Sequence, residues 1–432
     1  MTTLQIAGGR VLRPDMTVER GDVLVDRETG DVLAVGDTDD GDETLDAGGG
    51  LVMPGLVNAH THVSMTLLRG YADDKPLEDW LREDIWPAEA ELTPEAVRAG
   101  ADLGILEMIR SGTTGFADMY FYEPQVVAAV EASGVRAKLG HGVVTIGRDE
   151  AAARADLEES LEVATEYDGA ADGRVSTAVM PHSLTTVGEE YLREYVPKVR
   201  EAGVCLHYHL SETVHEVEPI VDAHGERPAA YARDLGMTTD ADFVAHGVHL
   251  DDAELALLAE TGTAIVHCPA SNMKLASGLA PVQRMLDAGV TVGLGTDGAA
   301  SNNDLDMFDE MRDAAMVGKI AADDASAVDA ATTVELATVG SAAALGFDAG
   351  RIEPGANADL VVLDLSAPRL TPAHDLVSHL AYAASGADVR HTVCDGQVLM
   401  RDRAVLTMDE ARVRDRAIEE AEALVARAEG AS

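Results

Sequence analysis

The middle of the chain alternates short apolar runs with longer helix-like segments, and this alternation restricts the possible fold more than any other feature. Between about residues 55 and 350, eight runs have the length and composition of buried β-strands. They read LVNAHTH, GTTGFADMY, VRAKLGHGV, RVSTAVMPH, VCLHYHLSE, FVAHGV, TAIVHCPAS and VTVGLGTDGA. Several of the intervening segments end in glycine, as helices commonly do. Alternating strands and helices predict a parallel sheet covered on both faces.

Eight repeats within about 300 residues favour a closed (β/α)8 barrel of the TIM type over an open doubly wound sheet. No G-x-G-x-x-G motif follows an early strand, which weakens the dinucleotide-binding alternative. Both ends of the chain instead contain short strand-like runs bounded by glycine and aspartate. We therefore predict an α/β chain with a catalytic barrel over residues 55–351 and a small β-sandwich built from residues 1–54 and 352–432. A C-terminal helix over 408–430 is expected to pack on the outside.

The charge of the chain is strongly one-sided, because 77 acidic residues face 32 basic ones and give a formal net charge of −45. A field of this sign repels phosphate backbones and excludes nucleic-acid binding through a basic surface as the main activity. The acidic residues are dispersed and lysine is rare, as in proteins from salt-loving cells, where salt screens the self-repulsion. We interpret the charge as a halophilic adaptation that carries no information about the substrate.

The sequence shows no membrane or secretory signal. Its longest apolar stretches are far shorter than the roughly 18 residues that a membrane span needs. The N-terminus has no basic region followed by an apolar core. Three widely spaced cysteines, Cys205, Cys268 and Cys394, do not make a disulfide framework and indicate a reducing compartment. We expect a cytoplasmic protein in which these cysteines are packing residues.

Polar side chains gather at the ends of the predicted barrel strands, where a barrel of this type places its active site. His60 and His62 end the first strand, and residues two apart in a strand point to the same side. The fifth, sixth and eighth strands end with further candidates: His209 followed by Glu212, then His246, then Asp297. Three imidazoles and a carboxylate suit zinc, with iron as the second choice, and leave one position for water. The reaction class that follows is metal-assisted hydrolysis.

These motifs also carry a family resemblance. The segments PGLVNAHTH, HYHLSET, HGVHL, HCPASNMKL and GLGTDGAASNN resemble the amidohydrolase superfamily, and more closely the deaminases of 5'-methylthioadenosine and S-adenosylhomocysteine. The likeness runs from residue 50 to about 365 and includes MTLLRGYADDKPLEDWL, EMIRSGTTGFADMY and GRIEPGANADLVVLDL. It implies a barrel with a β-sandwich assembled from both termini, and hydrolytic deamination of an adenine nucleoside to the inosyl product and ammonia.

The resemblance also implies roles for single residues. Four positions match the metal ligands of the family: His60, His62, His209 and Asp297. Asp297 is further expected to take a proton from the attacking water, and His246 to hold the resulting hydroxide. Glu212 matches the carboxylate that shuttles a proton to the purine ring. Glu89 and His182 match positions that hold the ribose hydroxyls.

The chain departs from the family pattern at the positions expected to face the far end of the substrate. Relatives often have a Pro-Tyr pair where this chain has Leu184 and Thr185. Some relatives carry an arginine at a site that here aligns with Asp156 or Ala155, with Arg154 only nearby. The 5' substituent of the substrate therefore stays open.

The number of metal ions is predicted from a missing residue. Many members of the superfamily bridge two metals with a lysine at the end of the fourth strand, whereas the run RVSTAVMPHS has no lysine and the closest, Lys198, lies in a helical segment. We therefore expect one divalent metal per chain, with zinc first and iron or manganese as alternatives.

Several competing functions share the same metal chemistry. A 5'-deoxyadenosine or adenosine deaminase would use every residue named above, whereas a guanine or cytosine deaminase would have no use for a ribose-binding Glu89. A triazine-type hydrolase and a non-catalytic barrel scaffold are more remote. We expect a small-molecule substrate, a homo-oligomer, and a lid formed by residues 63–92 with Trp80 and Trp86.

Overall fold

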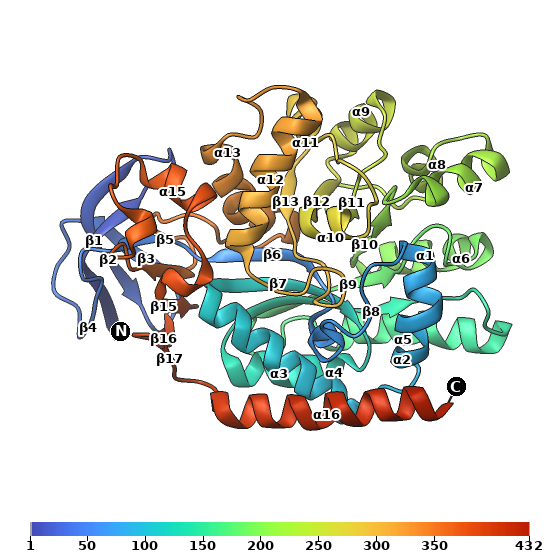
Figure 1. Cartoon of the computed structure of the whole chain (residues 1–432), viewed down its shortest axis with the longest axis horizontal. Helices are drawn as coiled ribbons and strands as arrows, with labels where there is room; N and C mark the ends of the chain where they lie inside the picture. Colours follow the sequence, from blue (N-terminus) through green and yellow to red (C-terminus); the bar gives the residue numbers. More distant parts are fainter. Residues whose placement is uncertain (1, 432) are drawn as a thin grey trace.

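The computed structural model describes residues 2–431, and its centre is an eight-stranded parallel sheet curled into a barrel (Figure 1). Its strands follow the chain in order: β6 (Leu56–Thr61), β7 (Thr113–Tyr120), β8 (Arg136–Val143), β9 (Val175–Pro181), β10 (Cys205–Leu210), β11 (Phe243–His246), β12 (Ala264–His267) and β13 (Val292–Leu294). Each coincides with one of the eight predicted runs, so the barrel prediction is confirmed.

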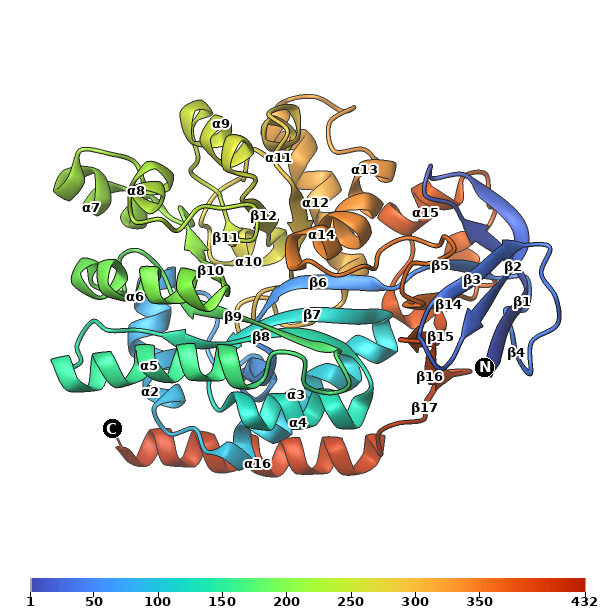
Figure 2. The same ribbon diagram turned by 180° about the vertical axis from the view of Figure 1, so that it is seen from behind.

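Helices cover the outside of the barrel (Figures 1 and 2). They are α3 (Pro94–Ser111), α4 (Glu123–Ser133), α5 (Glu150–Glu166), α6 (Glu189–Ala202), α7 (Val214–His224), α8 (Pro228–Asp234), α9 (Asp252–Thr261), α10 (Pro269–Lys274), α11 (Val282–Asp287), α12 (Met307–Ala322), α13 (Ala330–Glu335) and α14 (Ser341–Leu345). Local sequence fixes their ends, since Thr93 and Asp149 cap α3 and α5 at the N-terminus and Gly112 ends α3 in a left-handed conformation.

The barrel closes between its last and first strands through side chains. The Asn58 amide on β6 donates to Thr296 Oγ1 at 2.7 Å, and its carbonyl accepts from the Thr296 backbone at 2.9 Å. The Asp297 backbone amide donates to the His60 carbonyl at 3.0 Å. Gly295 allows this approach, because a Cβ atom there would lie 2.7 Å from the His60 nitrogen. The closure thus brings the polar residues at the end of the first barrel strand next to those at the end of the last strand.

A second sheet combines both ends of the chain. It contains β1 (Thr3–Leu12), β2 (Val18–Asp26), β3 (Val32–Gly36), β4 (Glu43–Asp46), β5 (Leu51–Pro54), β14 (Leu360–Leu363), β15 (Val389–Cys394), β16 (Gln397–Arg401) and β17 (Ala404–Val405). The two ends meet where β5 pairs antiparallel with β14. A buried ion pair, Arg136 Nε to Asp359 Oδ2 at 3.1 Å, ties the start of β8 to this sheet. The exact domain boundaries at residues 54 and 352 stay a prediction.

The C-terminal helix α16 (Glu410–Ala431) packs along the outside of α3, as the sequence predicts (Figure 1). Arg110 of α3 forms an ion pair with Glu410 at 2.8 Å. The three cysteines are buried and free, which agrees with their interpretation as packing residues. Among the described residues, the helices are all too short or too polar to span a bilayer.

Candidate active site

A cavity of about 760 Å³ lies at the C-terminal ends of the barrel strands. Seven of the eight predicted site residues line it: His62, Glu89, His182, His209, Glu212, His246 and Asp297. The eighth, His60, has no exposed surface. The structure therefore brings together residues that lie more than 230 positions apart in the sequence.

Four of these residues form a group that could hold a metal ion: His60, His62, His209 and Asp297. One potential ligand atom from each lies within 4.8 Å of the others. Asp297 Oδ1 lies 3.2 Å from His62 Nε2 and 3.5 Å from His60 Nε2. The arrangement matches the ligand set that the family resemblance implies.

Two of these histidines are oriented by backbone carbonyls. His62 Nδ1 donates to the Met119 carbonyl and His209 Nδ1 donates to the His182 carbonyl, both at 2.6 Å. Because a carbonyl can only accept, each Nδ1 carries the proton and each Nε2 keeps its lone pair for the centre of the group. His60 Nε2 is buried without a hydrogen-bond partner. Three imidazole lone pairs and one carboxylate oxygen fit a divalent metal such as zinc, and one of these imidazole nitrogens, His60 Nε2, has no other partner.

Asp297 is held by two hydroxyl groups that the sequence interpretation did not assign. Ser271 Oγ and Ser301 Oγ donate to Asp297 Oδ2 at 2.7 and 2.8 Å, which leaves Oδ1 facing the histidines. Burial opposes ionisation of Asp297, but its contacts with His60 and His62 hold its pKa well below the usual range. Asp297 also has a left-handed backbone with φ of 60°, a strained conformation that is common at functional sites.

Glu212 and His246 lie beside this group on neighbouring strand ends. Glu212 Oε2 is 3.7 Å from His246 Nε2, and Ser277 Oγ donates to Glu212 Oε1 at 3.2 Å. Burial raises the pKa of Glu212, and the charge of Asp297 adds to this rise while His246 opposes it. His246 Nδ1 lies 2.9 Å from Asn272 Oδ1, so its Nε2 is the nitrogen free to face the cavity. A carboxyl group with a raised pKa is suited to act as a general acid.

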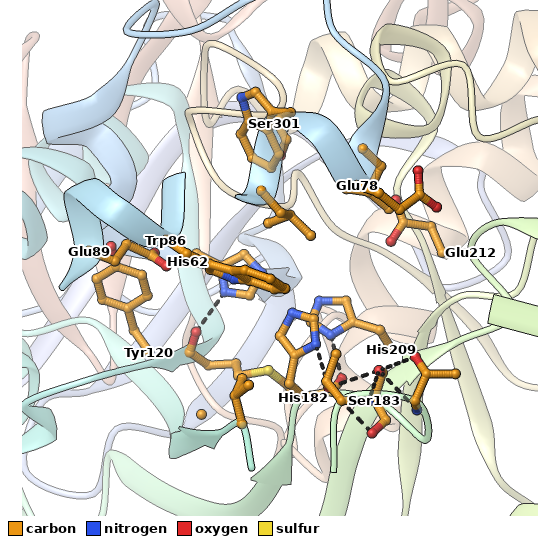
Figure 3. Close-up of a pocket in the computed structure, with 18 of the residues that line it drawn as sticks. His62, Glu78, Trp86, Glu89, Tyr120, His182, Ser183, His209, Glu212 and Ser301 are labelled. Atoms are coloured by element: carbon orange, nitrogen blue, oxygen red, sulfur yellow. Dashed lines mark hydrogen bonds between the residues drawn. The ribbon is translucent and has the colours of Figure 1, made fainter. Parts of the chain in front are cut away.

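Glu89 lies on the other side of the cavity, beside Tyr120 (Figure 3). Burial raises the pKa of Glu89 to about 7, although the nearby Tyr120 hydroxyl and His62 ring oppose the rise. His182 Nδ1 lies 3.1 Å from Thr186 Oγ1. Burial lowers the pKa of His182 to about 3, and its proximity to His62 and His60 adds to this effect, so its imidazole is neutral. This wall therefore offers hydrogen-bonding groups and no strong positive charge.

The lid segment contains α1 (Leu77–Trp80), a π-helical turn (Leu81–Ile85) and α2 (Trp86–Glu89). Trp80 and Trp86 both line the cavity, and Trp80 donates from Nε1 to the Ala72 carbonyl at 3.0 Å. Thr213 Oγ1, which follows β10, donates to Glu78 on α1 at 3.3 Å. The segment thus spans the mouth of the cavity, and its opening and closing stay a prediction.

A charged network borders the cavity at β8 and α5, and His141, Arg148 and Glu159 are its members that line the cavity. His141 lies between Glu123 and Asp156, with contacts of 3.2 Å to each carboxylate. Arg148 contacts the same Asp156 at 2.7 Å, and Glu159 lies next to the pair at the surface. Burial alone would lower the pKa of His141, but its hydrogen bonds to the Asp156 and Glu123 carboxylates raise it to about 10. We call these five residues the distal network.

The uncertain positions near this network are now placed. Asp156 is buried and paired, whereas Ala155 is exposed. Arg154 forms ion pairs with Glu150 and Glu194 and does not line the cavity. Of the residues that replace the Pro-Tyr pair, Leu184 is buried and Thr185 lines the cavity.

Sequence reasoning missed several polar residues that support the site. They are Tyr120 beside Glu89, Asn272 beside His246, and the two serines on Asp297. Ser271 and Asn272 lie in the segment HCPASNMKL, which carries part of the family resemblance and immediately follows a strand end. For Ser271 and Asn272, the signal available in the sequence was their position as polar residues directly after a barrel strand.

Known proteins are similar to this chain over nearly its whole length. The model of the amidohydrolase family matches residues 51–399. A protein of Haloarcula marismortui named 5-methylthioadenosine/S-adenosylhomocysteine deaminase is 68% identical over 99% of this chain and 100% of its own length. A 5'-deoxyadenosine deaminase of Methanosarcina mazei is 44% identical over 95% of each chain.

A solved structure agrees with these sequence relatives. An adenosine deaminase from Xanthomonas campestris with bound zinc superposes with a TM-score of 0.92 at 38% identity, covering 98% of this chain and 99% of that one. The Haloarcula relative comes from a halophilic archaeon, which agrees with the interpretation of the acidic composition. The matched family model, the identities and the shared barrel show that this chain belongs to the amidohydrolase family.

Proposed function

We propose that this protein is a metal-dependent deaminase that hydrolyses the 6-amino group of an adenine nucleoside, with 5'-methylthioadenosine and S-adenosylhomocysteine as its substrates. The observation that carries the proposal is the position of a protonatable carboxyl, Glu212, beside a four-residue metal group, with Glu89 on the other side of the cavity. The name and 68% identity of the Haloarcula relative support the same substrates.

The proposed cofactor is one divalent ion per chain, held by the metal group described above. Zinc is the first choice, because the similar Xanthomonas structure contains zinc, and iron and manganese are the alternatives. When bound, such an ion lowers the pKa of water towards neutrality and so supplies hydroxide.

The residues around the metal group divide the proton transfers. Asp297 accepts a proton from the attacking water, and the two serine hydroxyls that donate to Oδ2 hold its carboxylate in place. His246 orients the attacking oxygen through Nε2, since its Nδ1 is engaged by Asn272. Glu212 donates its proton to ring nitrogen 1, which makes carbon 6 a better electrophile. A proton then moves to the amino group, the bond from carbon 6 to nitrogen breaks, and ammonia leaves.

Glu89 and His182 orient the nucleoside and take no part in bond breaking. A buried carboxylate is suited to accept hydrogen bonds from the two vicinal ribose hydroxyls, and a neutral imidazole can accept or donate one more. Substrates that lack one of these hydroxyls should be deaminated much more slowly, because a buried polar group of the protein would be left unpaired.

The second candidate is deamination of 5'-deoxyadenosine, as the name of the Methanosarcina relative suggests. The distal network supports this alternative, because both of its cations are already paired with carboxylates. A substrate with a small uncharged 5' group makes no demand on that network. Guanine, cytosine and triazine substrates are less well supported, because they would leave Glu89 without a ribose to bind.

Ammonia release separates these possibilities. The zinc-loaded protein would be assayed in high salt with methylthioadenosine, adenosylhomocysteine, 5'-deoxyadenosine and adenosine, and with adenine, guanine and cytosine. Turnover of the nucleosides alone would support the proposal, and their ranking would identify the 5' group. Turnover of a free base would contradict the roles of Glu89 and His182. A folded, metal-loaded protein that turns over nothing would favour the scaffold alternative.

The remaining partners stay predictions. We infer a small-molecule substrate and no nucleic-acid partner, because the acidic surface repels phosphate backbones. A homo-oligomer is expected, and light scattering in high salt would measure its size.

A further inference from the structure

A buried histidine that has no role in the scheme above contacts the least accessible residue of the metal group. His207 lies on β10, two residues before His209, and has no exposed surface. Its Nε2 is 2.8 Å from His60 Nδ1, and its Nδ1 is 2.9 Å from the Phe243 carbonyl. The two rings and the carbonyl therefore form one chain of hydrogen bonds that ends at the metal group.

The positions of the protons in this chain of hydrogen bonds follow from the Phe243 carbonyl, which forms the end farthest from the metal group. The Phe243 carbonyl can only accept, so His207 Nδ1 must carry a proton and donate it. In a neutral His207 the other nitrogen, Nε2, then has a lone pair and accepts from His60 Nδ1. With its proton on Nδ1, His60 keeps the lone pair of Nε2, the buried atom that has no other partner.

The opposite arrangement would disable the metal group. If His60 carried its proton on Nε2, that proton would point towards Asp297 Oδ1, 3.5 Å away, and occupy the direction of a metal bond. His62 and His209 avoid this problem because the carbonyls of Met119 and His182 hold their Nδ1 protons directly. At His60 a second imidazole takes the place of that carbonyl.

We propose that His207 is a positioning residue that fixes the tautomer of His60, and so keeps Nε2 of His60 available to the metal. The inference rests on the metal group of the proposed function but not on the identity of the substrate. Packing holds His207 in the required orientation, because its ring stacks on the Phe243 ring at 4.0 Å with an interplanar angle of 12°. Groups that orient a metal-binding histidine commonly change metal affinity about 10- to 100-fold when removed.

Two substitutions of the same residue test the proposal. Gln at position 207 has an oxygen to accept from His60 and an amide to donate to the Phe243 carbonyl, whereas Leu can do neither. We expect His207→Leu to weaken zinc binding about 10- to 100-fold in competition with a chromophoric chelator. The zinc affinity of His207→Gln should stay within about threefold of that of the wild type. The visible spectrum of the cobalt-substituted protein should change in His207→Leu and be restored in His207→Gln.

A control variant on the same strand separates an effect on the His60 tautomer from a general effect on the stability of the fold. Tyr208→Phe removes a buried hydrogen bond of 3.2 Å to the Met237 carbonyl, from a side chain on the opposite face of β10. We expect it to lower thermal stability without changing zinc affinity. Equal zinc affinity in wild type and a folded His207→Leu would overturn the proposal, as would a His207→Gln protein that binds as weakly as His207→Leu.

A direct measurement covers the case in which His207→Leu does not fold. In the zinc-loaded wild type with 15N-labelled histidine, the ring signals should show both His207 and His60 protonated on Nδ1, with His207→Gln used to assign the signals. A proton on Nε2 of His207 would overturn the proposal. A wild type that binds no zinc would contradict the metal assignment itself, whereas failure to deaminate nucleosides with zinc binding intact would contradict only the proposed reaction.

Discussion

The metal group and the distal network belong to one cavity but are built in opposite ways. At the metal group, buried side chains at strand ends each have a fixed partner, such as the carbonyls behind His62 and His209. In the distal network, Arg148 and Glu159 are exposed and reach in from the loop after β8 and from α5. The strands place the reacting groups rigidly, whereas the loop and helix place the groups that face the variable part of the substrate.

The two regions therefore differ in how freely their residues can be substituted without loss of the chemistry. Side chains on rigid elements with buried partners hold catalytic geometry, and loops carry variation in binding. The departures from the family pattern, Asp156, Leu184 and Thr185, all lie near the distal network or the loop after β9. We therefore expect substitutions at the metal group to change turnover, and substitutions in the distal network to change the ranking of substrates.

The largest expected effect is on the metal group. Dialysis against a strong chelator should lower turnover by at least about a thousandfold, because no other group supplies hydroxide near neutral pH. Circular dichroism should show that the helices persist, and added zinc should restore activity. Full activity in protein shown to be free of metal would contradict the proposed cofactor.

The next effect is at the proton shuttle. Glu212→Gln cannot donate a proton to the ring, so kcat should fall about 100-fold or more. Metal content per chain, measured by atomic emission, should be unchanged because Glu212 is not in the metal group. Activity retained in a metal-loaded variant would remove Glu212 from the mechanism.

A smaller effect is expected on the ribose side. Glu89→Ala removes the acceptor for the ribose hydroxyls and should raise KM for nucleosides about tenfold, the size expected for losing a hydrogen bond to a charged group. Glu91→Ala is the matched control, because Glu91 lies two residues away and does not line the cavity. An unchanged KM in Glu89→Ala would exclude the ribose role.

At the distal network we expect a change in preference rather than in rate. Asp156→Asn weakens the pairing of Arg148 and leaves its guanidinium free for a carboxylate on the substrate. The ratio of kcat/KM for adenosylhomocysteine to that for methylthioadenosine should rise about three- to tenfold, as partly exposed charge pairs allow. Glu162→Gln, an exposed change on the same helix, should leave the ratio unchanged. An unchanged ratio in Asp156→Asn would show that the substrate does not reach Asp156.

We expect the smallest effect on turnover for substitution of His141. This substitution should instead alter how the stability of the fold depends on pH. The folded pKa of His141, about 10, lies above the value of about 6.5 in an unfolded chain, so the protonated ring stabilises the fold below pH 6.5. This stabilisation is lost as the pH rises through about 10. His141→Gln has no such proton, so the difference in unfolding free energy between wild type and variant should shrink from pH 6 to pH 10. A constant difference in denaturant titrations would contradict the raised pKa.

The barrel and the strand ends that carry chemistry can be predicted from the sequence alone. The period of two in NAHTH places His60 and His62 on one side, and parallel strands bring their C-terminal ends to one face. The choice of His209 and Asp297 as further ligands came from the family resemblance. The structure brings these four residues together, and their roles await the experiments above.

The groups that support the candidate site become visible only in the folded chain. Asn58 meets Thr296 across 238 positions of sequence, and no local pattern encodes such a pairing. The sequence likewise gave no reason to pair His207 with His60 or to enclose His141 between two carboxylates. Local periodicity determines which face a side chain occupies, but closure of the barrel determines its neighbours. Hydrogen bonds and pKa values depend on those neighbours, so they are set by the folded chain and not by any segment of it.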